Sequence, residues 1–302
     1  MSPEAIAFVN QALVPIGLAL IMFSMGLTLA LRDFAAILSG GRAAVAGLAT
    51  HLLVLPLLGL GVGALFGLSP ELALGLFIIS ICPAGTTSNA LTFVGRGNLA
   101  LAVVLTLMTS VVTVFTIPLL LRWAVPWFLG DGGAGGGSGA VPQLDIVSTM
   151  GQLARITLAP IALGMVVRRF APGAAAVMAQ RLRPTAFIVL VAVIGFSVIV
   201  SFDMVVQNLI AATPAIYALN AAAMAFGLLV GRLLGLNQRD RMTLAIETGV
   251  QNATLALFLT LTVLGSLPLA VTQNIYGVVM LLNATLLIRW FKGRIAREEA
   301  VA

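Results

Sequence analysis

The strongest constraint on this chain is a succession of long apolar runs, separated by short segments that hold most of the charged residues. An α-helix needs about 20 apolar residues to cross the hydrocarbon core of a bilayer. We predict nine transmembrane helices: Ala12–Leu31, Ala43–Leu68, Leu72–Phe93, Leu99–Leu121, Ile146–Val167, Thr185–Phe202, Leu209–Val230, Met242–Leu264 and Leu269–Ile288. Only 9% of the residues are charged, against about 25% in soluble domains, which excludes a soluble enzyme and a disordered chain. The prediction is an all-α, polytopic membrane protein.

The basic residues indicate how these helices are oriented. Cytoplasmic loops of membrane proteins collect Lys and Arg. With nine spans and a cytoplasmic C-terminus, the inner segments hold all but two of the sixteen basic residues: Arg32, Arg42, Arg96, Arg168, Arg169, Arg181, Arg183, Arg232, Arg239, Arg241, Arg289, Lys292, Arg294 and Arg297. The outer side holds Arg122 and Arg155. This bias predicts an inner (plasma) membrane protein with its N-terminus outside, and since the bases are scattered singly, no nucleic-acid partner is expected.

Two of the predicted spans contain Pro, Gly and polar residues at mid-membrane depth. They are the third, at Cys82-Pro83-Ala84-Gly85-Thr86-Thr87-Ser88-Asn89, and the eighth, at Glu247-Thr248-Gly249-Val250-Gln251-Asn252. Irregular backbone is tolerated at that depth only where it is buried in protein or lines a cavity. The two spans run in opposite directions, each penultimate in its half of the chain. This pattern predicts an inverted repeat with broken helices near 83–88 and 247–252.

A glycine-rich segment divides the two halves. Residues 130–140 read GDGGAGGGSGA, which is typical of a flexible linker. The predicted organisation is a first membrane repeat of four spans at 1–130, an outer linker at 131–145, and a second repeat of five spans at 146–302.

Glu247 is the one acidic residue that falls inside a predicted span, and an ionisable group there marks an ion or proton path by default. Opening the helix at Gly249 would free main-chain carbonyl oxygens, those of Glu247, Thr248 and Val250. Discontinuous helices bind sodium with such oxygens, and Ser88 and Asn89 could complete the site from the other broken helix. The alternative is a protonated carboxyl that bridges two helices.

The second half of each broken helix begins at the break, so its free N–H groups and positive dipole end point into the membrane centre. We expect Thr86, Thr87 and Ser88 to cap the first of these ends. Such an end attracts a carboxylate. The expectation is an organic anion taken up together with a cation.

These segments, with Ile21–Leu29 and Arg96–Asn98, resemble the bile acid:sodium symporter family. The resemblance implies two crossing broken helices in a core domain, a panel domain, and alternating access. It also implies that two sodium ions are transported with a bile salt or with a smaller carboxylate, such as a pantoate-like or keto acid. No cofactor is expected beyond sodium as the coupling ion, and the expected state is a monomer in the lipid bilayer.

The resemblance also assigns residues by position. The first sodium site would use Ser88, Asn89, Thr106 and Glu247. The second would use Glu247, Thr248, Val250, Gln251 and the position of His51. The substrate contacts would be Thr86, Thr87, Asn252 and, as a weaker candidate, Asn283.

Two positions depart from the family pattern. Ala102 stands where the family has a serine, which removes one hydroxyl from the first site. His51 stands where the family has a glutamine, and a neutral imidazole nitrogen is a poorer sodium ligand than an amide oxygen. Since imidazole also titrates near neutral pH, a transporter that couples to protons through His51 and Glu247 is the alternative. A membrane-embedded enzyme or receptor finds little support, because one His and one mid-membrane Glu in different spans do not make a nucleophile and base.

Overall fold

The computed structural model describes residues 7–30, 41–130 and 144–301, and within them every regular element is a helix, apart from one isolated bridge. The first half contains η1 (Val9–Leu13), α2 (Val14–Gly26), α4 (Gly41–Ala49), η2 (Thr50–Val54), α5 (Leu55–Leu65), α6 (Pro70–Ile81), α7 (Thr86–Val94) and α8 (Leu99–Leu129). The second contains α9 (Ile146–Leu153), η3 (Ala154–Leu158), α10 (Ala159–Phe170), α11 (Pro172–Val200), α12 (Phe202–Leu233), α13 (Gln238–Gly249), α14 (Ala253–Leu257), η4 (Phe258–Val263) and α15 (Leu267–Val301). The segments labelled η are single π-helical turns that continue the neighbouring α-helices.

The all-α prediction is confirmed, and the chain is a polytopic membrane protein. Five continuous helices in the described ranges are long and apolar enough to cross a membrane: Gly41–Leu65, Leu99–Leu129, Ile146–Phe170, Phe202–Leu233 and Leu267–Arg297. Further apolar helices are shorter, such as Pro70–Ile81 and Ala253–Val263, because the chain breaks beside them.

Several helices extend well beyond the predicted apolar runs. The run predicted at Thr185–Phe202 is the second half of α11, which begins at Pro172, and the run at Leu209–Val230 lies within α12. Hydropathy marks only the apolar part of a helix, whereas a helix continues through polar residues as long as its main-chain bonds are satisfied. The predicted boundaries at these helix ends were therefore wrong by up to several turns.

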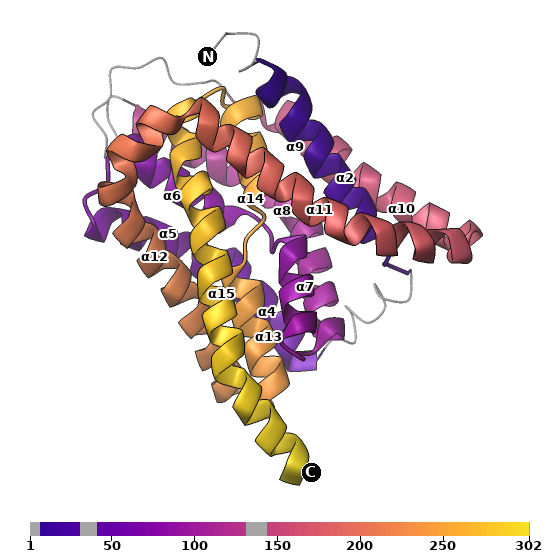
Figure 1. The fold of residues 1–302 in the computed structure, drawn as a ribbon. Coiled ribbons are helices and arrows are strands. Elements are labelled where there is room, and N and C mark those ends of the chain that lie inside the picture. The colour runs from indigo at the N-terminus through magenta and orange to yellow at the C-terminus, as the bar shows by residue number, and fades with distance from the viewer. Residues whose placement is uncertain (1–6, 31–40, 131–143, 302) are drawn as a thin grey trace.

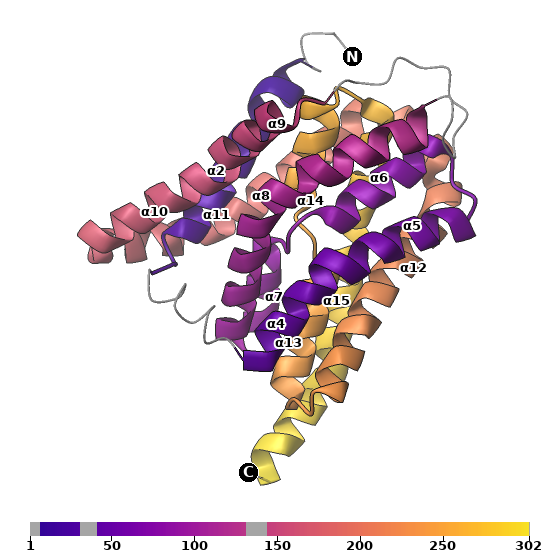
Figure 2. The same cartoon turned by 180° about the vertical axis from the view of Figure 1, so that it is seen from behind.

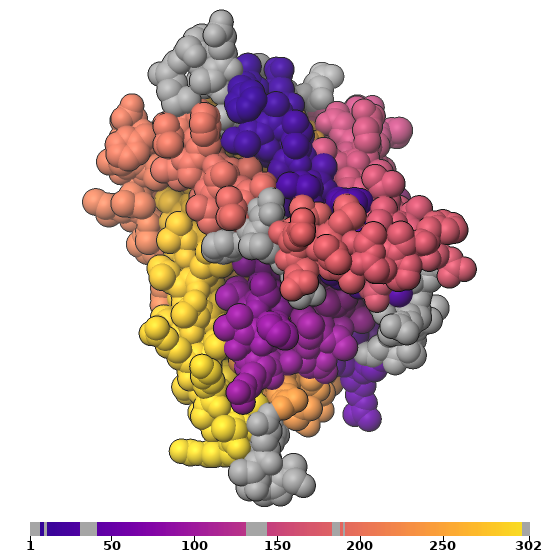
Figure 3. All heavy atoms as spheres, turned by 45° about the vertical axis from the view of Figure 1, so that its right-hand side comes forward, coloured from indigo at the N-terminus to yellow at the C-terminus, as the bar shows by residue number. Residues whose placement is uncertain are grey.

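The helices pack in two groups. One group consists of α2, α10 and α11, which contact one another; in Figure 1, α2 and α10 lie to the right and α11 runs from beside α10 across the molecule toward α12. In the other, α12 packs against α13, α15 and α5, and α6 packs against α5, α8 and α15, as the view from behind also shows (Figure 2). The space-filling view shows α10 and α11 standing out from the body of the molecule beside α7 (Figure 3).

The first helix interruption lies at 82–85, and Pro83 explains it. A proline has no N–H to donate and holds the residue before it in an extended conformation; Cys82 accordingly has φ −72° and ψ 153°, and α6 ends at Ile81. Helix α7 then begins after Gly85, which occupies the N-cap position without a side-chain bond. The prediction that Thr86, Thr87 and Ser88 cap this helix is wrong, because they form its first turn.

The second interruption lies at 250–252. Helix α13 continues through Gly249, its last residue, and the C-cap residue Val250 is extended, with φ −99° and ψ 93°. Asn252 caps α14, since its Oδ1 accepts the N–H of Leu255 at 3.0 Å. The helix therefore opens one residue later than expected, and Glu247 and Thr248 still lie within α13.

The two interruptions meet in the interior. Ala84 and Gln251 form an antiparallel bridge, the Gly85 N–H donates to Val250 O at 2.9 Å, and the Asn252 N–H donates to Pro83 O at 2.9 Å. Within a membrane every main-chain polar group needs a protein partner, and here each interruption supplies partners to the other. Gly85 allows the approach, because a Cβ on it would lie 2.8 Å from Gln251 O.

Most of the predicted linker, residues 131–143, lies outside the described residues. The following helix begins directly after it, where both carboxylate oxygens of Asp145 accept main-chain N–H groups of Val147 and Ser148 at 3.3 and 3.1 Å.

Candidate ion and substrate site

Glu247 is the centre of the candidate site. It lies on α13, next to the second interruption, and is 1% exposed. Ser88 Oγ, from α7, donates to Oε1, and Thr106 Oγ1, from α8, donates to Oε2 at 2.9 Å. No Lys or Arg of the described ranges contacts the carboxylate, so hydroxyl groups from two other helices are its polar partners.

Both hydroxyl groups also reach a main-chain acceptor. Ser88 Oγ lies 2.7 Å from Gly85 O, and Thr106 Oγ1 lies 3.0 Å from Ala102 O. Each hydroxyl has one proton and two lone pairs. If its proton turns to the main-chain carbonyl, its oxygen lone pairs and the carboxylate are free to face a cation.

Asn89 follows Ser88 in the first turn of α7. Its Oδ1 atom is buried and has no hydrogen-bond partner, which is uncommon for a buried polar atom. Ala102, at the position that departs from the family pattern, is fully buried and contributes only its carbonyl, to Thr106.

His51 joins the second predicted set of residues through a hydrogen-bonded chain. His51 Nε2 lies 3.0 Å from Gln251 Oε1, and Gln251 Nε2 donates to Thr248 O at 2.7 Å. With the Gln251 amide assigned in this orientation, its oxygen can only accept, so the imidazole donates from Nε2. Gln251 Oε1 is thus directed at His51.

The other members of the second set are also engaged by protein groups. Val250 O accepts the Gly85 N–H, and Thr248 Oγ1 lies 2.8 Å from Leu244 O and 3.0 Å from Ala223 O. Val250 O thus serves the crossing of the two interruptions, while the Thr248 hydroxyl bonds within α13 and to α12.

The four predicted substrate contacts lie in different surroundings. Thr86 and Thr87 are half-buried in the first turn of α7. Asn252 is buried, and its Nδ2 donor has no partner. Asn283, on α15, donates to Asn220 Oδ1 at 2.9 Å, so its amide supports another side chain.

Sequence reasoning missed Asn220 and Tyr276. Asn220 Nδ2 and Tyr276 OH both donate to Gly249 O, at 2.7 and 2.9 Å, and all of these side chains are buried. They hold the last carbonyl of α13 in place. A single polar residue in an apolar span often bonds across helices, and Asn220 in the run 209–230 was the available signal.

The comparisons with known proteins fit this geometry. The family model described as "Sodium Bile acid symporter family" matches residues 15–208. The chain belongs to this family. The resemblance is therefore confirmed, and the chain is a member of a transporter family and not an enzyme.

Several relatives cover most of the chain. The "Uncharacterized sodium-dependent transporter YocS" of Bacillus subtilis is 26% identical over 95% of this chain and 85% of its own length. The "Ileal sodium/bile acid cotransporter" of Homo sapiens is 27% identical over 83% of this chain and 69% of its own length. The "Probable sodium/metabolite cotransporter BASS1, chloroplastic" of Oryza sativa is 27% identical over 85% of this chain, which spans 60% of the rice protein.

Proposed function

We propose that this protein is a sodium-coupled symporter of an organic anion. The observation that carries the proposal is the buried carboxylate of Glu247, which hydroxyl groups from two other helices hold and which no basic residue in the described ranges neutralises. A buried charge is costly unless it is paired. A bound monovalent cation removes that cost.

The available oxygen atoms support sodium as the cation and the set around Ser88 as its first site. Glu247, Ser88, Thr106 and the unpaired Asn89 Oδ1 offer only oxygen atoms, the ligands that hard cations take at discontinuous helices. The second set, Thr248, Val250 and Gln251 with His51, binds an ion only if Gln251 Oε1 turns away from His51.

The anion would bind at the start of the second half of the broken helices. The first turn of α7 contains Thr86 and Thr87, and such an N-terminus favours negative charge. Asn252 Nδ2 is a buried donor without a protein partner, as expected of a group that bonds a carboxylate. Sodium bound at Glu247 removes the negative charge that would otherwise repel the anion. The substrate is a carboxylate, such as a pantoate-like or keto acid or a bile salt.

The transport cycle would be alternating access between the two helix groups. We assign α2, α10 and α11 to a panel domain and the group with both interruptions to a core domain, in an inverted repeat of nine spans. The protein would work as a monomer in the inner (plasma) membrane, with its N-terminus outside and its C-terminus in the cytoplasm.

The test is Glu247→Gln, which removes the charge and keeps the shape. Two charges 4 Å apart attract by about 4 kcal/mol at an effective dielectric constant of about 20, so we expect a roughly thousandfold loss of sodium affinity. Sodium should then no longer raise the melting temperature of the purified protein over potassium. Uptake of labelled pantoate, pyruvate or taurocholate into proteoliposomes should lose its sodium dependence.

The matched control is Glu71→Gln, which removes an exposed acid in the first turn of α6. This variant should keep the response to sodium. Sodium-dependent stabilisation that survives in Glu247→Gln would exclude Glu247 as the ion ligand.

A proton-coupled organic anion transporter is the second candidate, and the His51–Gln251 hydrogen bond favours it. Uptake against a pH gradient without sodium, compared with uptake in a sodium gradient at fixed pH, separates the two mechanisms. His51→Gln should abolish uptake if protons couple through His51. If sodium is the coupling ion, the same variant should keep or increase the sodium response.

A further inference from the structure

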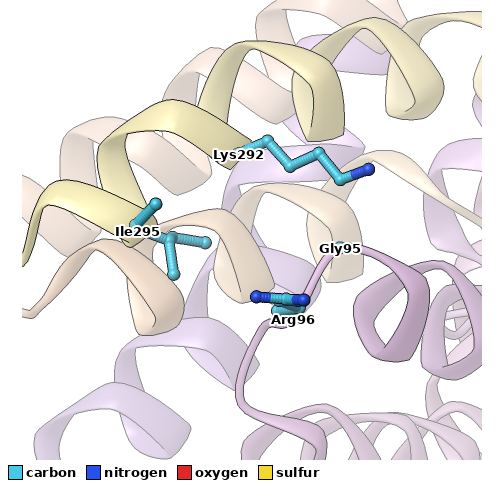
Figure 4. A pocket seen from close by; sticks show the side chains of 5 residues that line it. Gly95, Arg96, Lys292 and Ile295 are labelled. Atoms are coloured by element: carbon cyan, nitrogen blue, oxygen red, sulfur yellow. The ribbon is translucent and has the colours of Figure 1, made fainter. Parts of the chain in front are cut away.

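A basic pocket lies away from the crossing, between the end of α7 and the last turns of α15. Gly95, Arg96, Lys292, Ile295 and Ala296 line it, and its volume is about 280 Å³. Figure 4 shows Arg96, from the loop after α7, and Lys292, from α15, on either side of the opening. Two cations from segments far apart in the sequence thus share one cavity.

Neither cation is neutralised within the described part of the chain. The side chains of Arg96 and Lys292 make no hydrogen bond or ion pair there. Arg294, two residues after Lys292 on α15, is not part of the lining, and its guanidinium lies 3.8 Å from the centre of the Trp290 ring. Among the described side chains, the two cations of the pocket therefore have no acidic partner.

The backbone at Arg96 is a second, independent observation. Arg96 has φ 59°, and it is the one non-glycine residue of the described ranges with positive φ. A residue in the left-handed conformation after a helix is usually Gly or Asn. For any other residue type this conformation costs roughly 1–2 kcal/mol. Such an outlier points to a role for the side chain, and here that side chain lines the pocket.

Exposed apolar side chains lie close to the pocket in sequence, at the end of α7 and among the basic residues of α15. Phe93 and Val94, directly before Gly95, are 66% and 64% exposed, and Trp290 is 51% exposed. Exposed apolar side chains on a membrane protein face acyl chains, and Trp gathers at the boundary between acyl chains and headgroups. A ligand in this pocket would place a negative charge between the two cations, and apolar chains of the same ligand would lie beside the exposed apolar side chains.

We propose that this pocket binds the phosphate headgroup of an anionic phospholipid. Arg offers a planar fork that matches phosphate oxygens and Lys a point charge, which together suit a phosphodiester. Basic pockets between transmembrane helices bind lipid headgroups by the same chemistry. The lipid would tie α7, which contains Ser88, to α15.

The experiment uses the full-length protein in detergent and counts bound lipid by native mass spectrometry. The probes are phosphatidylglycerol, neutral phosphatidylcholine, and glycerol phosphate as a soluble phosphate source. The test variant is Arg96→Asn with Lys292→Gln, because Asn tolerates positive φ. The control variant is Arg232→Gln with Arg289→Gln, which removes the same charge from two exposed side chains outside the pocket.

Each basic residue near an anionic lipid contributes about 1 kcal/mol. Wild type and control should therefore bind phosphatidylglycerol over phosphatidylcholine, and the test variant should bind it roughly tenfold to thirtyfold more weakly. Without lipid, the test variant should have the same melting temperature as the control variant, which shows that the substitutions leave it folded.

Equal binding of phosphatidylglycerol by the test variant and wild type would overturn the proposal. Occupancy by glycerol phosphate with no preference for phosphatidylglycerol would also overturn it, since the site would then serve a soluble anion.

Discussion

The contact between the two helix interruptions can be tested at Gly85. Gly85→Ala places a Cβ 2.8 Å from Gln251 O and 3.1 Å from Gln251 C. The Gly85 backbone has φ −80° and ψ 147°, which alanine adopts without strain. The effect of the substitution is therefore purely steric, and main-chain atoms of the second interruption must move.

The expected loss of stability follows from the main-chain atoms that must move. Overpacking of this kind costs about 1–3 kcal/mol. The two main-chain bonds of the crossing, each 2.9 Å long, contribute about 0.5–1.5 kcal/mol apiece and would be stretched. We expect a loss of about 2–4 kcal/mol, and a displacement of Ser88 away from Glu247.

The assay is thermal unfolding of the purified protein in potassium and in sodium. Gly85→Ala should unfold several degrees lower in potassium and should gain less from sodium than wild type does. The control is Gly63→Ala in α5, where a Cβ would lie 3.5 Å from Ala73 Cβ, an ordinary contact. That variant should match wild type or be more stable by up to about 1 kcal/mol.

One result would refute this reasoning. If Gly85→Ala keeps both the melting temperature and the sodium response of wild type, the close approach of the two interruptions does not shape the cation site.

Three further substitutions distinguish residues that would bind the ion from residues that hold the surrounding helices in place. Thr106→Val removes the hydroxyl oxygen that would face the cation once its proton turns to Ala102 O, and since polar contacts to charged groups contribute about 1.5–3 kcal/mol, the sodium concentration for half-maximal stabilisation should rise roughly tenfold or more; an unchanged midpoint in a sodium titration would contradict this role. Asn220→Leu removes one of two donors to Gly249 O and should lower the melting temperature by an amount equivalent to about 1–3 kcal/mol, with a smaller effect on the sodium midpoint than Thr106→Val has. Gly164→Ala places a Cβ 2.5 Å from a main-chain oxygen of α2 and should destabilise the packing of α2 on α10 by about 1–3 kcal/mol, measured as earlier unfolding in denaturant; wild-type stability would show that the two helices separate freely.

The interruptions could be predicted because their causes are local. Pro83 removes a donor and restrains Cys82, so the end of α6 follows from two adjacent residues. The second interruption was predicted one residue early, because Gly249 permits opening without requiring it. Gly249 stays helical, and the backbone becomes extended at Val250, whose carbonyl accepts the Gly85 N–H of the first interruption.

The support around the site could not be predicted, because it depends on distant contacts. Tyr276 and Asn220 are 56 residues apart and meet at Gly249 O. The residues that flank Asn220 or Tyr276 in the sequence do not indicate that both side chains bond to Gly249 O. In the same way, Asn283 resembles a candidate substrate contact in the sequence, while its amide is bonded to Asn220.

The crossing links ion binding to the shape of the protein. The main-chain groups left over at each interruption find partners in the other interruption, and the same approach brings the α7 hydroxyl of Ser88 to the α13 carboxylate of Glu247. A movement that separates α7 from α13 therefore breaks both sets of bonds together. A cation that binds Ser88 and Glu247 at once stabilises the crossed arrangement by its own binding free energy, and a ligand that favours one arrangement shifts the population toward it. The group that contains the crossing should then move as a unit, so that α2, α10 and α11 supply the motion.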